Sequence, residues 1–139
     1  MLYIKSISVP ANTPPTSPAE DTITIEEEVV LFVSVRFPPG PSGLLKTALF
    51  YGDMQLFPSP KGSWAYGDNE TVWDLLVWEA PESPVKLTIK AYNEDDTYDH
   101  SAIYRIVALN KEEAMFMRAT WRLSESLLRF LRHVIGWRG

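Results

Sequence analysis

The densest group of potential ligand atoms in the chain lies between Asn93 and His100. This segment, NEDDTYDH, contains four acidic residues and a histidine. Calcium and magnesium prefer such oxygen ligands, so Asp95, Asp96 and Asp99 are candidate metal ligands. The segment lacks the central glycine and final glutamate of an EF-hand loop. Asp and Asn are also common in turns, where their side chains bond to the local backbone, and we favour that structural interpretation.

Aromatic residues in a turn-rich segment, 58–69, offer a second kind of chemistry. Trp64 and Tyr66 lie close together in PSPKGSWAYGDN, and flat aromatic rings can stack on sugars or on a protein receptor. They therefore form a possible ligand surface on a loop of the fold. The competing interpretation is that they belong to a core or an interface, which is the commoner use of aromatic side chains.

Motifs for nucleophilic and phosphate chemistry are missing from the sequence. The chain has no cysteine and two histidines, and no serine sits in a G-x-S-x-G setting. Segment 38–43 contains glycines, but its three prolines lack the backbone donors that a phosphate site needs. We expect no enzymatic activity and no cofactor. The net charge of −5 argues against nucleic acid as a partner, because phosphate contacts require a basic face.

Short β-like segments must position these groups. Apolar and polar residues alternate in several runs bounded by proline and glycine; the expected strands are 1–10, 22–37 with a turn at its glutamates, 44–51, 54–57, 71–79, 85–92 and 100–109. A Pro-rich loop covers 10–20. Gly52-Asp53 predicts a tight hairpin or a bulge, and 85–92 is expected to pair with 100–109 as a hairpin.

These segments predict a mainly β fold. No helical pattern separates the strands, so parallel βαβ units are excluded and an antiparallel β-sandwich over residues 1–110 is expected. Jelly-roll and immunoglobulin-like connectivities remain open, because strand order cannot be read from periodicity.

Residues 111–139 predict a C-terminal amphipathic α-helix with a narrow polar stripe. At 100° per residue, four arginines between positions 118 and 132 fall near one line, and most of the remaining surface is apolar. The apolar residues expected to form an oligomer or partner interface are Phe116, Met117, Trp121, Leu123, Leu127, Leu128, Phe130, Leu131, Val134, Ile135 and Trp137.

This apolar surface exceeds the arc that a helix needs to lie on its own domain. Its spacing fits a coiled-coil seam with a second seam beside it, which is typical of a helix that contacts several copies. Two alternatives remain: a helix lying on a membrane surface with its arginines at anionic head groups, and a helix folded back onto its own sandwich. Residues 1–110 carry 7 basic and 15 acidic residues, whereas 111–139 carry 6 and 3, so the body is acidic and the tail basic.

Three segments resemble a known group of proteins. FPPGPSGL (37–44), YGDMQLFP (51–58) and AYNEDDTYDH (91–100) resemble segments of small virus-associated proteins of uncharacterised activity, and the resemblance covers about residues 20–110. It implies a small β-sandwich in a virus particle. Together with the helix, it predicts a virion structural subunit, such as a penton, decoration, fibre or tail component, that assembles with copies of itself or with other virion proteins. A carbohydrate- or receptor-binding module and a peripheral membrane protein are the alternatives.

Overall fold

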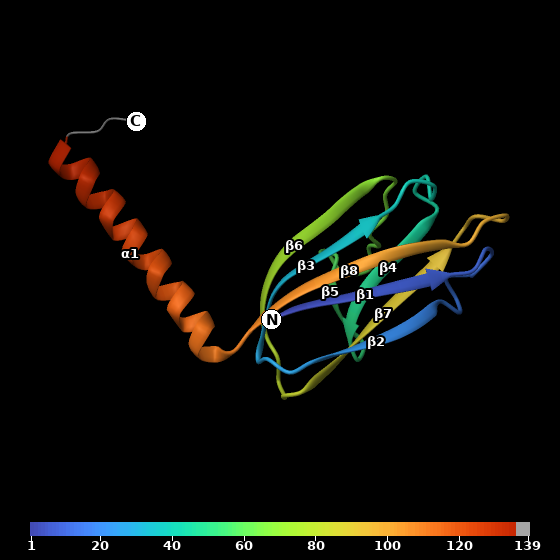
Figure 1. The fold of residues 1–139 in the computed structure, drawn as a ribbon, viewed down its shortest axis with the longest axis horizontal. Helices are drawn as coiled ribbons and strands as arrows, with labels where there is room; N and C mark the ends of the chain where they lie inside the picture. The colour runs from blue at the N-terminus through green and yellow to red at the C-terminus, as the bar shows by residue number, and fades with distance from the viewer. Residues whose placement is uncertain (136–139) are drawn as a thin grey trace.

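The computed structural model describes residues 1–135, and for Val134 and Ile135 it describes only the backbone. Eight strands precede one helix (Figure 1). The elements are β1 (Leu2–Val9), β2 (Ala19–Ile25), β3 (Val29–Phe37), β4 (Leu45–Tyr51), β5 (Met54–Phe57), β6 (Glu70–Glu79), β7 (Val85–Asn93), β8 (His100–Leu109) and α1 (Lys111–Ile135). The predicted mainly β fold with a C-terminal helix is therefore confirmed.

The strands form two four-stranded antiparallel sheets. Sheet A has the order β1-β8-β3-β6 and sheet B the order β2-β7-β4-β5. Strands β1 to β4 pair in turn with β8, β7, β6 and β5, so the first half of the sandwich wraps antiparallel to the second. This connectivity is that of an eight-stranded jelly roll, and it decides between the two topologies that the sequence left open.

Every connection except β4–β5 crosses between the sheets. Strand β7 pairs with β2 and β4, while β8 pairs with β1 and β3, so the predicted hairpin of 85–92 with 100–109 is wrong. Both strands alternate in the same way and a six-residue loop joins them; such a loop is long enough to reach the opposite sheet, which packs about 10 Å away. Strand β2 also begins earlier than expected, inside the predicted 10–20 loop.

Two predicted turns are present. The glutamate-rich turn separates β2 from β3, and Gly52 with Asp53 joins β4 to β5. Gly52 has a φ of 56°, a backbone conformation that suits glycine because it lacks a Cβ. The β4–β5 register shifts between Leu49 and Phe50, inside β4 and not at the Gly52-Asp53 pair where the sequence offered a bulge as the alternative to a hairpin.

The core lies between the two sheets and is apolar except for a small number of paired polar groups. Phe37, Leu49 and Ile106 are fully buried there. Thr47 Oγ1 donates to the Lys90 carbonyl (3.0 Å) and lies 2.8 Å from the Tyr104 hydroxyl, which donates to it in turn. Burial raises the pKa of the Tyr104 hydroxyl, so this group remains a neutral donor.

Candidate assembly surface

The start of α1 is fixed by a reciprocal cap. Asn110 Oδ1 accepts a hydrogen bond from the Glu113 N–H (2.8 Å), and Glu113 Oε2 accepts one from the Asn110 N–H (3.2 Å). Glu28, in the β2–β3 turn, accepts a further bond from the Lys111 N–H (2.7 Å). These bonds satisfy backbone donors that every helix leaves open at its first turn. The sandwich therefore holds the base of the helix at a defined residue.

A second contact joins the helix to the edge of sheet A. Arg118 Nη2 lies 3.6 Å from Glu79 Oε1 at the end of β6, with both side chains more than half exposed, so this ion pair adds little stability. An apolar groove of about 330 Å³ separates the helix from sheet A. Leu31, Leu75 and Val77 line it from the sheet, and Met117 and Trp121 line it from the helix.

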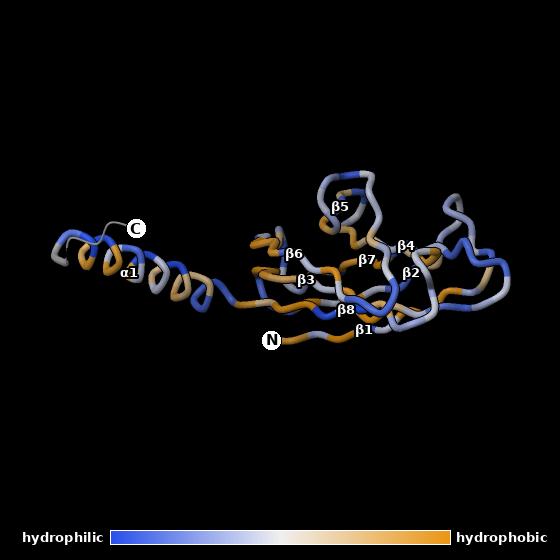
Figure 2. Tube along the Cα trace, turned by 90° about the horizontal axis from the view of Figure 1, so that it is seen from above, coloured by the Kyte–Doolittle hydropathy of each residue, from blue (hydrophilic) through white to orange (hydrophobic). Residues whose placement is uncertain are grey.

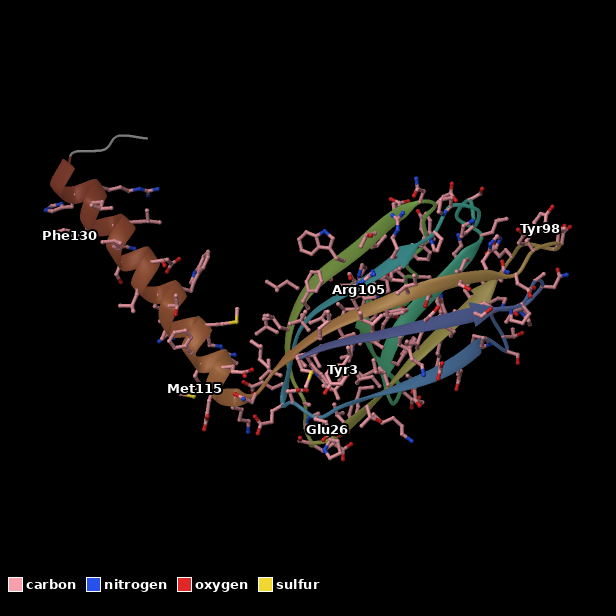
Figure 3. All side chains as sticks on the ribbon, viewed as in Figure 1. Tyr3, Glu26, Tyr98, Arg105, Met115 and Phe130 are labelled. Carbon is pink, nitrogen blue, oxygen red and sulfur yellow. The ribbon has the colours of Figure 1, made fainter. Side chains whose placement is uncertain are left out.

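Beyond its base, α1 projects away from the sandwich (Figure 1). Its 25 residues correspond to a rod about 37 Å long. Hydrophilic and hydrophobic residues alternate along this rod (Figure 2). Met115 lies at the base of this rod and Phe130 lies near its far end, away from the sheets (Figure 3). The self-docked alternative is therefore wrong: α1 does not fold back onto its own sandwich.

The predicted interface residues that the structure describes are all exposed. Their exposed fractions run from 40% for Leu131 to 73% for Phe116. The set is Phe116, Met117, Trp121, Leu123, Leu127, Leu128, Phe130 and Leu131. The side chains of Val134 and Ile135, and the whole of Trp137, lie outside the described residues. Among residues 1–135, Met117 and Trp121 border the groove beside sheet A, and the other side chains of this set stay exposed.

A second apolar surface, on the outer face of sheet A, was not predicted from the sequence. Strand β6 turns Trp73, Leu75 and Val77 outward, with exposed fractions of 64%, 59% and 41%, while Leu76 and Trp78 pack against the core. Leu2 and Ile4 are exposed on β1, at the other edge of the sheet. The sequence signal was present: β6 is apolar at both alternating sets of positions, which a strand with one wet face does not require.

Trp64 and Tyr66 lie beside the outer face of sheet B. The Trp64 ring meets Phe50 and Tyr92 at centroid distances of 6.4 and 4.9 Å, and Trp64 is half-buried. Tyr66 is exposed, with Lys46 Nζ 4.3 Å from its ring centroid. The structure thus packs Trp64 into an aromatic cluster and leaves the Tyr66 ring with one face under a lysine. These two rings do not form a shared flat platform of free faces.

The acidic loop between β7 and β8 is organised by hydrogen bonds to its own backbone. Asp95 accepts bonds from the Thr97 and Tyr98 N–H groups and pairs with His100 Nε2 at 2.7 Å. The Thr97 bond and the histidine hold the pKa of the Asp95 carboxyl below its usual range.

The other two candidate ligands are also used locally. Asp99 accepts a bond from the Ala11 N–H, and Asp96 accepts one from the Thr97 hydroxyl. Within residues 1–135, no three histidine or acidic side chains are arranged to hold a metal ion. The structure therefore does not bring Asp95, Asp96 and Asp99 together as a ligand group: Asp95 and Asp96 bond to Thr97, whereas Asp99 bonds to Ala11 in the β1–β2 connection.

Across the same residues, no helix combines the length and apolar character that crossing a bilayer demands.

Comparisons with known proteins bear on the fold only. No family model and no curated protein matches the chain. Among solved structures, the cyanophage Pam1 capsid asymmetric unit is 15% identical, with 76% of this chain and 81% of that chain covered and a TM-score of 0.48. FLHE is 9% identical over 76% and 94%, with a TM-score of 0.35. The infectious bursal disease virus VP2 subviral particle is 9% identical over 78% and 32%, also at 0.35. The strand order, and not these distant likenesses, defines the jelly roll.

Proposed function

We propose that this protein is a structural subunit of a virus particle and that it assembles by burying the apolar face of α1 against a neighbouring protein. The observation that carries the proposal is the helix itself, which is capped at its base, projects from the sandwich and exposes large apolar side chains along its length. Monomeric soluble proteins rarely expose so large a contiguous apolar surface.

The virion setting is supported by two further considerations. Jelly rolls are frequent among viral capsid and lectin domains, although a fold alone does not define a function. The segments at 37–44, 51–58 and 91–100 add the resemblance to virus-associated proteins. We place the protein in the virion as a penton, decoration, fibre or tail component. Its role there would be to bind neighbouring proteins in a fixed arrangement, without catalysis.

The carbohydrate- or receptor-binding alternative has weaker support. A sugar platform needs a free aromatic face, and the Trp64 ring is engaged with Phe50 and Tyr92. Tyr66 alone offers an exposed ring, and Lys46 covers one side of it. The membrane-surface alternative uses the same helix as the assembly proposal, so it becomes an outcome of the test.

Sedimentation equilibrium of the full chain tests the proposal. The wild-type protein should be oligomeric, and Leu127→Glu should raise the dissociation constant at least about tenfold, because burying one leucine contributes about 1.5–3 kcal/mol. The matched control is Ser126→Glu, which adds the same charge at the adjacent, more polar position and should leave assembly nearly unchanged.

Two results would overturn the proposal. One is a wild-type chain that stays monomeric at every soluble concentration. The other is a chain that is monomeric in solution but floats with vesicles containing anionic lipid, with Leu127→Glu abolishing flotation. The second result would assign α1 to a membrane surface instead.

A further inference from the structure

The outer face of sheet A carries an apolar row that crosses all four strands. Leu2 on β1 is paired with Val107 on β8, Val107 with Phe32 on β3, and Phe32 with Leu75 on β6. Adjacent strands lie about 4.8 Å apart, so this row is about 14 Å wide. Trp73 extends it and packs on Phe32 at a ring-centroid distance of 5.7 Å. We call this row with Trp73 the sheet A patch.

The helix of the same chain does not cover the sheet A patch with its apolar face. The side of α1 that lines the groove carries Trp121 together with Arg118 and Arg122. At 100° per residue, Leu123 and Leu127 lie roughly 100–180° around the helix from Arg118, Trp121 and Arg122. Met117 and Trp121 border the groove beside Leu75, but the side of the helix with Leu123 and Leu127 faces away from it. Each protomer therefore presents two apolar surfaces, one on the far side of the helix and one on the sheet.

Charge indicates which surface the rod prefers. Residues 1–110 carry 7 basic and 15 acidic residues, and 111–139 carry 6 and 3, so a tail docked on another body joins opposite charges. A tail docked on another tail joins like charges. Five of the acidic residues lie at the end of the sandwich nearest the helix, three in the β2–β3 turn together with Glu79 and Glu82, and Arg118 of α1 pairs with Glu79 there.

We infer that the sheet A patch receives the apolar face of α1 from a second copy of this chain. The contact is head-to-tail: one protomer contributes its rod and the next its sheet, so the assembly closes into a ring or continues as a chain. This inference rests on the proposed function, since it names the partner of the same helix. A bundle of helices alone would leave the patch of every copy exposed.

Complementation between two variants tests this inference. Leu127→Glu damages the rod and keeps the patch, whereas Leu75→Lys damages the patch and keeps the rod. Leu75 is 59% exposed, so a lysine there does not disturb the core. Each substitution alone should raise the dissociation constant at least about tenfold. In an equimolar mixture, the intact helix of Leu75→Lys should bind the intact patch of Leu127→Glu, and the complex should contain only two copies because the other helix and patch are damaged. Thr24→Lys, on the exposed outer side of sheet B, is the charge-matched control and should assemble like the wild type.

The possible failures are distinguishable. If Leu75→Lys assembles like the wild type and the mixture forms no dimer, helices pair with helices; the sheet A patch is then excluded as the receiving surface while the proposed function stands. If the wild type itself stays monomeric, both proposals fall.

Discussion

In the proposed assembly, the cap at Asn110 should couple the stability of α1 to association. A helix with few contacts to its own domain is marginal in water, so its ordering has to be driven by its partner. Asn110→Ala removes the acceptor of the Glu113 N–H bond, which costs about 1 kcal/mol of helix stability. Because α1 must be helical to present its apolar face, the free energy of association becomes less favourable by the same amount. The dissociation constant should therefore rise about fivefold for each helix buried.

Two measurements on the same samples check this prediction. Far-ultraviolet circular dichroism of dilute protein should show less helix for Asn110→Ala than for the wild type, and sedimentation should show the weaker association. Asn110→Ser keeps an N-cap acceptor, so it should lie within about twofold of the wild type. If Asn110→Ala loses helix but keeps the wild-type dissociation constant, folding of α1 and assembly are independent and the reasoning is refuted.

Two further predictions concern the sandwich. Thr47→Val leaves the Tyr104 hydroxyl buried without a partner and should cost about 1–3 kcal/mol in urea unfolding, more than Tyr104→Phe at about 1 kcal/mol; the reverse order would contradict the hydrogen-bond assignment. Val77 has a φ of 46° where the β3–β6 register shifts, and a left-handed conformation costs residues with a Cβ about 1–2 kcal/mol. Val77→Gly should therefore be more stable than Val77→Ala by about 0.5–1 kcal/mol, opposite to the usual order in strands; equal or lower stability of the glycine variant would show that the backbone there is unstrained.

The existence of the strands could be predicted from the sequence because burial of one face imposes alternation. Val85 to Asn93 alternates buried and more exposed residues along its whole length, as the spacing of Val85, Leu87 and Ile89 indicates. The partners of each strand could not be predicted in this way. Alternation shows which face of a strand is buried. Because both sheets turn an apolar face toward the same core, a strand has the same sequence pattern in either sheet.

The helix was easier to recognise than its surroundings. A narrow arginine stripe is a clear sequence signal for an amphipathic helix. The reciprocal cap is a weaker signal, because Asn110 stands three residues before Glu113 where the motif usually has serine or threonine. The sheet A patch needs residues from four strands that are distant in sequence, so only the strand order brings Leu2 next to Val107. The metal hypothesis depended on an arrangement that the sequence does not determine: Asp95 and Asp96 bond within their own loop, and Asp99 bonds to Ala11 in another connection.

The two ends of the sandwich differ in the length of their connections. Short turns close the end where α1 emerges, while the longer connections, 10–18, 38–44, 58–69 and 94–99, gather at the opposite end, where Tyr98 stands exposed at a tip (Figure 3). The proposed contacts of α1 and of the sheet A patch involve neither Tyr98 nor its loop. A foreign peptide inserted after Tyr98 should therefore leave association unchanged.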